Sequence, residues 1–231
     1  IKRIGQMDVA VLNDVGHDDF ARRMIAASEK PHLPIINANA DVPLLSTMAL
    51  GTPQGRAVNP HTFISISASM LQVGTIARGL GKISPENAPF FEDNARAYNK
   101  RLRKLRAQAL AKVKEGPDAN FRVATIHGAY DYLLREFGLE VSAVVEPAHG
   151  MEPSAAQLKS MVDRLRSQNI RVLFAEQDNP TGFVQTLVRE TGVRVTHISH
   201  GPYTADKFEK DMAFNLDAVV RAIEESRKAR A

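Results

Sequence analysis

The sequence predicts an α/β protein with two lobes. Each lobe has a mainly parallel sheet covered by helices, and one long backbone helix joins the two lobes. Short apolar runs alternate with amphipathic helical stretches along most of the 231 residues, the pattern of parallel sheets with helices on both faces. One uninterrupted helical pattern, unusually long for a globular protein, separates the two halves of the chain. With 44% apolar and 24% charged residues, the composition is that of a globular chain rather than a disordered one.

The first lobe is expected over residues 1–83. Its expected elements are a strand at 9–12, a helix at 18–28, a strand at 34–36 and a helix at 63–80. The last of these helices ends before Gly81, as helices often do. Proline and glycine punctuate residues 37–60, which are therefore expected to form a loop.

The long helix is expected over residues 84–116. Ser84 suits an N-cap, Pro85 suits the first turn, and Glu86 favours the positive end of the helix dipole. Apolar residues then recur at helical spacing as far as Val113. At about 1.5 Å per residue, such a helix reaches about 45 Å, so we interpret it as a strut between the lobes.

The second lobe is expected over residues 117–231. Its expected strands are 121–126, 141–145, 172–175 and 193–198, and its expected helices are 130–137, 154–168, 181–191 and 207–230. Regular alternation of strands and helices at this spacing predicts a parallel sheet covered on both faces.

Composition excludes several classes of function. Thirty basic residues face twenty-six acidic ones, and the dense run at 100–106 lies in an amphipathic helix, so we interpret it as a solvated face and expect no nucleic-acid partner. The absence of Cys excludes disulfide frameworks and thiolate metal sites. No apolar run approaches the length of a membrane span, so no stable membrane insertion of this chain is expected. The glycine-rich phosphate loops, the G-x-S-x-G elbow and H-E-x-x-H are missing as well.

Histidines mark the candidate site. In open parallel sheets, ligands bind beyond the carboxyl ends of the strands. Histidines from different parts of the chain lie at such ends or at a loop-to-helix junction: His17, His61, His127 and His200. Neutral imidazoles from separate elements suit zinc, so the pattern indicates a metal site. For each of these histidines taken alone, the alternative is an ordinary hydrogen-bonded residue of the surface or core. His197 lies inside a predicted strand, and we interpret it as such a residue.

Several segments match known motifs in order and spacing. Asn59-Pro60-His61-Thr62-Phe63 is similar to D-P-H-x-W, residues 84–95 to D-P-E-N-x-x-Y-Y-x-x-N-A, and residues 125–133 to F-H-D-A-F-x-Y-F. Glu152-Pro153-Ser154 and residues 172–176 match an E-P-S helix start and an I-F-x-E strand end. Together these segments resemble the zinc/manganese-type substrate-binding proteins of ABC transporters, the cluster A-I family.

The resemblance implies a receptor rather than an enzyme. Such a protein lies in the periplasm or otherwise outside the cytoplasm, captures a divalent transition metal between two lobes and delivers it to an ABC transporter permease. The bound ion is thus cargo. A set of nitrogen ligands favours zinc, with manganese as the alternative ion.

The resemblance also implies the ligands. His61 and His127 stand at the second and third ligand positions of the family, and His200 stands where the family usually has an Asp. The family's first ligand lies in a P-H-x-x-E-P loop that has no match here, so we expect the first lobe to be incomplete relative to the family and expect no signal segment within these residues. His17 is placed to fill that vacancy; its alternative is a helix-start or solvent-facing role.

Two rival functions remain open. A zinc-dependent hydrolase would hold the metal with three histidines, keep an open position for water and use Glu176 as general base. A protein that binds an organic ligand would use aromatic residues such as Phe63 and Tyr203. In the receptor interpretation, Glu176 and Asp131 are instead expected to orient the ligand rings, and the alternative for Asp131 is an exposed helix position.

Overall fold

The structure, a computed structural model, describes residues 2–46, 58–117, 120–145, 153–176, 181–201 and 208–228. The chain divides into two compact units. The first comprises Ile1–Leu45 and Val58–Lys104, and the second contains Leu105–Ala231. Each unit has a parallel sheet accompanied by helices, and a long helix is present, so the predicted α/β fold class is confirmed.

The first unit is built on a small parallel sheet. Its elements are β1 (Ala10–Leu12), α1 (Asp19–Ala26), β2 (Ile35–Asn37), α2 (Ile66–Ile83) and most of α3 (Ala88–Lys112). The strands β1 and β2 pair in parallel, with Val11 opposite Ile36. Ile4, Ile25 and Leu33 form a small hydrophobic core, in which α1 packs against the 3-10 turn Ile4–Gln6.

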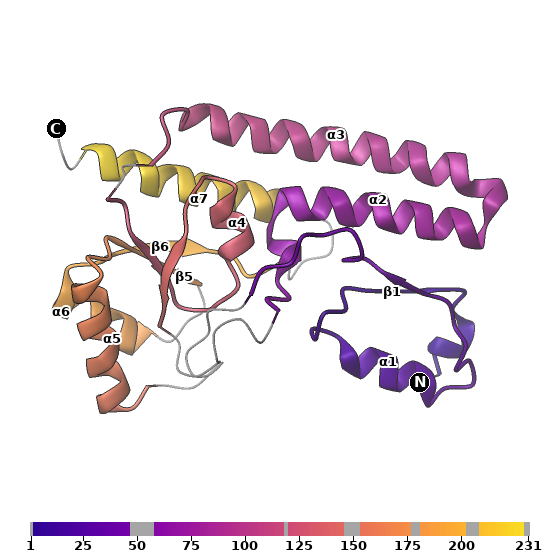
Figure 1. The fold of residues 1–231 in the computed structure, drawn as a ribbon, viewed down its shortest axis with the longest axis horizontal. Coiled ribbons are helices and arrows are strands. Elements are labelled where there is room, and N and C mark those ends of the chain that lie inside the picture. The colour runs from indigo at the N-terminus through magenta and orange to yellow at the C-terminus, as the bar shows by residue number, and fades with distance from the viewer. Residues whose placement is uncertain are drawn as a thin grey trace. The chain divides into compact units, whose positions relative to one another are not determined.

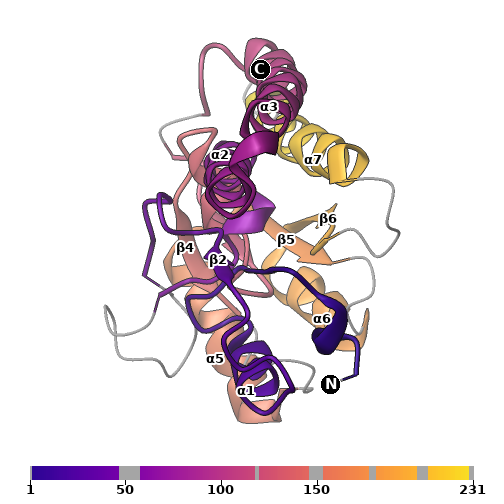
Figure 2. The ribbon, with the colours of Figure 1, turned by 90° about the vertical axis from the view of Figure 1, so that its right-hand side faces the viewer.

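Helix α2 packs closely on β2 because a glycine faces the strand. A Cβ placed on Gly79 would lie 2.7 Å from Cδ1 of Ile36, closer than two carbon atoms can approach. Helix α2 begins later than the predicted residue 63, since a short 3-10 turn, Thr62–Ile64, precedes it. Ser65 caps it by accepting a hydrogen bond from the Ala68 amide at 3.2 Å. Figures 1 and 2 show α2 and α3 side by side.

The long helix is shorter than the sequence predicts. A 3-10 turn, Pro85–Asn87, leads into α3, whose 25 residues end at Lys112. At 1.5 Å per residue, α3 is about 37 Å long. Ser84 is not the side-chain cap that we expected, because its hydroxyl donates to the carboxylate of Glu86 instead of accepting a backbone amide. No helix in the described ranges has the length and apolarity that crossing a membrane requires.

The second unit is a parallel α/β sheet. Its elements are β3 (Val123–Thr125), α4 (Asp131–Arg135), β4 (Val141–Val144), α5 (Ala155–Ser167), β5 (Val172–Glu176), α6 (Thr181–Thr191), β6 (Arg194–Ile198) and α7 (Phe208–Lys228). The strand order is β4-β3-β5-β6, and every pair is parallel. The chain leaves β3 toward β4 on one side and later returns to add β5 on the other, so the topological switch point lies between β3 and β5.

Helices cover both faces of this sheet (Figure 1), with α5 and α6 on one side and α7 on the other. Leu173 and Ala124 point toward α5 and α6, where they join Leu165 and Leu187 in the main core. Helix α5 starts where the sequence predicts, because Ser154 and Gln157 form a reciprocal capping box. The burial of β3, β4 and β5 explains why these strands are mostly apolar, whereas the edge strand β6 also carries Arg194, Thr196 and His197.

Candidate metal centre

Two histidines lie together at the carboxyl edge of the four-stranded sheet. His127 follows β3 and His200 follows β6, and their ring centroids are 5.1 Å apart with the planes at 82°. The two strands flank β5, whose last residue is Glu176. The pair therefore sits beside the switch point, where parallel sheets bind their ligands.

A buried amide fixes the backbone that carries His200. Asn215 of α7 is fully buried; its Oδ1 accepts from the Ser199 amide at 2.7 Å, and its Nδ2 donates to the Ser199 carbonyl oxygen at 2.9 Å. The N–H and the carbonyl oxygen of Ser199, the residue before His200, are thus both hydrogen-bonded. The turn after β6 is consequently held by α7 as well as by the strand.

Glu176, at the end of the strand between β3 and β6, is held by a hydrogen bond. The hydroxyl of Tyr130, a fully buried residue, donates to Oε1 of Glu176 at 2.9 Å, and its ring centroid lies 6.4 Å from that of His200. Asp131 is buried, 9% exposed, so the alternative that it is an exposed helix residue is wrong. Asp131 is the first residue of α4 and directly follows the buried Tyr130.

In the first unit, an asparagine orients the imidazole of His61. Oδ1 of Asn59, a fully buried residue, accepts from the His61 main-chain amide at 3.1 Å and lies 2.9 Å from His61 Nδ1. Because this oxygen is an acceptor, the contact places the ring proton on Nδ1. The lone pair of Nε2 is then the one that can bind a metal.

A buried polar network ties the turn of His61 to the end of β1. Nε2 of Gln72 donates to Oδ1 of Asn39 at 2.8 Å and to Oγ1 of Thr62 at 3.0 Å. Asn39 donates to the carbonyl oxygen of Asn13 at 2.7 Å, and Asn13 Nδ2 donates to the Pro60 carbonyl oxygen at 2.8 Å. These hydrogen bonds hold Pro60 and Thr62, the residues on either side of His61.

The same network lies beside His17. The His17 ring is 6.2 Å from the His61 ring and 5.2 Å from that of Phe63. The loop before it is strained, because Asp14 and Val15 have φ values of 61° and 51°, and a β-branched residue rarely adopts this left-handed conformation. Strain of this kind gathers at functional sites, where the surroundings enforce it.

The structure therefore groups the predicted residues as two pairs. His127 and His200 meet within the second unit, and His17 and His61 lie together within the first. Tyr203 and Glu152 fall outside the described residues. Sequence reasoning missed Asn59 as an orienting residue and Asn215 altogether. The signal for Asn215 was a single amide on an otherwise apolar helix face, beside Met212, Leu216 and Val219.

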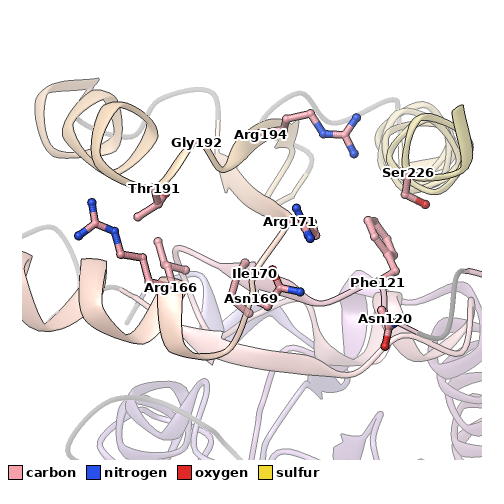
Figure 3. A pocket seen from close by; sticks show the side chains of 11 residues that line it. Asn120, Phe121, Arg166, Asn169, Ile170, Arg171, Thr191, Gly192, Arg194 and Ser226 are labelled. Carbon is pink, nitrogen blue, oxygen red and sulfur yellow. The ribbon is translucent and has the colours of Figure 1, made fainter. Parts of the chain in front are cut away.

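A hollow of about 520 Å³ opens at the opposite edge of the same sheet (Figure 3). Arg166, Arg171 and Arg194 line it, and such positive charge would repel a metal ion. Two of these arginines have structural partners. Arg166 donates to the carbonyl oxygen of Glu190 in the last turn of α6, and Arg194 lies 3.4 Å from the Glu225 carboxylate. We interpret the cluster as compensation for the negative ends of α5 and α6.

The chain is similar to solved structures of one substrate-binding protein (SBP) with a bound metal ion. The SBP FpvC of Pseudomonas aeruginosa in complex with Mn²⁺ is 62% identical, with a TM-score of 0.88 over 97% of this chain and 83% of that one. The same protein in complex with Ni²⁺ is 61% identical, with a TM-score of 0.87 over 97% and 81% of the two chains.

More distant relatives carry names of metal transport. The high-affinity zinc uptake system protein ZnuA of Bacillus subtilis is 24% identical over 92% of this chain and 73% of its own. The metal ABC transporter substrate-binding lipoprotein FimA of Streptococcus parasanguinis is 24% identical over 75% of this chain, which spans 58% of that relative's length. Residues 1–222 match the family model described as the periplasmic zinc-uptake complex component A. The chain therefore belongs to the ZnuA family of periplasmic zinc-uptake components.

Proposed function

We propose that this protein is an extracytoplasmic receptor that captures one divalent transition metal ion and hands it to an ABC transporter permease. The observation that carries the proposal is the pair His127 and His200, whose rings meet at the carboxyl edge of a parallel sheet. Family membership supports the transport role, and the names of the relatives support the metal as cargo.

We propose that His61 of the first unit completes the site with the pair from the second. Its Nδ1 faces Asn59, which leaves Nε2 as the donor atom. Binding by both units would let the ion itself couple them, with residues 1–83 and 117–231 as the lobes and residues 84–116 as the connecting helix. His17 is the proposed fourth ligand, because its ring already lies beside that of His61.

Zinc is the proposed ion. Imidazole nitrogens bind first-row metals with an affinity that rises from manganese to nickel and copper, and zinc also binds more tightly than manganese. A site of histidines alone therefore prefers zinc to manganese, which favours carboxylate and water oxygens. The FpvC complexes with Mn²⁺ and Ni²⁺ support a site that accepts several ions of this series.

No observation favours the hydrolase. Its proposed general base, Glu176, accepts a hydrogen bond from Tyr130, an arrangement that suits an orienting carboxylate. The family is one of transporter components, which supports a role without catalysis.

Zinc titration of single-histidine variants tests the proposal. His127→Ala and His200→Ala should each weaken zinc binding at least about tenfold, because each removes a direct ligand. His197→Ala is the matched control, since His197 is an exposed residue of the same strand that leads to His200. Equal zinc affinity in His127→Ala and the parent would overturn the assignment. The His17→Ala protein tests the fourth ligand in the same assay.

A further inference from the structure

We propose that the groove between α2 and α3 is a docking surface for an acidic segment of a partner polypeptide. The groove has a volume of about 680 Å³ and lies entirely within the first unit. Four cationic side chains line it: Arg78 from α2, and Arg96, Lys100 and Arg103 from α3. Glu92 is the acidic residue among its lining.

The positive charge of the chain is concentrated on this helix pair. Residues 66–112 hold nine Lys or Arg and three Asp or Glu, a net charge of +6, whereas the whole chain carries +4. The remaining residues thus have a net charge of −2. A field so unevenly distributed attracts and orients an anionic partner toward one face of the molecule.

Two of the four cations are available to a partner. Arg78 pairs with Asp41, and Arg96 pairs with Glu92 at 3.6 Å and with Asp93. Within the part of the chain that the structure describes, Lys100 and Arg103 make no ion pair with a carboxylate. Unlike the arginines at the far edge of the second unit, they flank no helix end, so the helix dipole does not explain them.

The shape of the groove favours a polypeptide over a flat surface. Arg96, Lys100 and Arg103 recur at the i, i+4, i+7 spacing of one helix stripe and span about 10 Å. Carboxylates two turns apart on a helix match that span, and carboxylates one turn apart match the step between neighbouring cations of the stripe. Gly74 and Ala77 leave room for another backbone to approach, whereas a bilayer surface would not enter a recess.

Binding of a glutamate-rich peptide with fluorescent label tests this surface. The double variant Lys100→Glu/Arg103→Glu should bind the peptide at least about tenfold more weakly than the parent, and binding should weaken with salt. The control Lys159→Glu/Arg189→Glu makes the same change in net charge at exposed sites of the second unit, with side chains 78% and 72% exposed. It should stay within about twofold of the parent.

Three outcomes would overturn the proposal: no binding to the parent, equal loss in both double variants, or binding of anionic phosphatidylglycerol vesicles without binding of the peptide. The milder Lys100→Ala/Arg103→Ala protein, checked for folding by circular dichroism, repeats the test without charge reversal. Zinc titration of the same proteins should give unchanged isotherms, because none of these residues lies at the histidine pairs. Failure of this surface therefore leaves the proposed metal function standing.

Discussion

The close contact between α2 and β2 predicts that adding a single methyl group will destabilise the first unit. In Gly79→Ala, the new Cβ would lie 2.7, 2.8 and 2.9 Å from Cδ1, Cγ1 and Cγ2 of Ile36. Three contacts that short force the helix or the strand to shift, at a cost of about 2 to 3 kcal/mol, the upper part of the range for overpacking a core. The higher helix propensity of Ala returns about 1 kcal/mol. We therefore expect a net loss of about 1 to 2 kcal/mol in the free energy of unfolding.

Gly74→Ala is the matched control in the same helix. Its Cβ would meet a single atom, the guanidinium nitrogen Nη1 of Arg78, at 3.3 Å. Because that atom is the end of a flexible, exposed side chain, it can move aside. The helix propensity of Ala then stabilises the variant by up to about 1 kcal/mol. Urea unfolding followed by far-UV circular dichroism measures both variants against the parent.

The free energy of unfolding should fall in Gly79→Ala and rise in Gly74→Ala, and this difference in sign is the test. Combining Gly79→Ala with Ile36→Ala should cost less than the sum of the two single changes, since the second substitution removes the atoms that clash. A stabilising or neutral Gly79→Ala, or strict additivity of the two changes, would refute the close packing of α2 on β2.

Three further predictions concern stability and metal binding. Asn215→Ala removes both hydrogen bonds to Ser199 and should weaken zinc binding about tenfold through the misplaced His200, with a control at the exposed Arg221 having no effect. The Thr75 hydroxyl, which donates at 2.7 Å, and the charge of Arg78 hold the pKa of Asp41 below its usual 3.8. Since the folded pKa is the lower one, this contribution to stability is present above about pH 4 and is lost as the pH falls through the folded pKa. Asp41→Asn should accordingly cost less stability in urea unfolding at acid pH than near neutrality; a constant cost would contradict the ion-pair account. Zinc affinity should fall as the pH drops below about 6.5, because protons compete for imidazole nitrogens, and a flat profile would indicate carboxylate ligands.

The hydrophobic pattern predicted the second unit well because its central strands, β3 and β5, are almost entirely buried. The apolar run around Leu173 predicts β5 to within one residue, and the rule that ligands bind at strand ends selects His127 and His200, whose ring centroids lie 5.1 Å apart. Capping was less predictable. Ser154 and Ser84 both precede plausible helix starts, yet only Ser154 forms a capping box, since the Ser84 hydroxyl turns to Glu86.

The orienting amides could not be predicted from local pattern. Asn215 is sixteen positions away from Ser199, with which it pairs, and an isolated asparagine in a helix carries no sign of its partner. Asn59 lies only two residues before His61, and its Oδ1 accepts from the His61 amide as in an Asx turn, but an asparagine before a proline is also an ordinary loop residue. The contact between Asn215 and Ser199 depends on the fold, whereas the contact between Asn59 and His61 is a local one that the sequence pattern does not distinguish from a plain turn.

The number of zinc ions bound per chain tests whether His61 and His127 bind the same ion. Native mass spectrometry and calorimetry on the parent should give one tightly bound zinc per chain, and His61→Ala and His127→Ala should each lose that same ion. If the two histidine pairs instead bind independently, the parent will hold two zinc ions and each variant will keep one. One ion lost by either substitution supports a single site shared by both units, and two separable ions would contradict it.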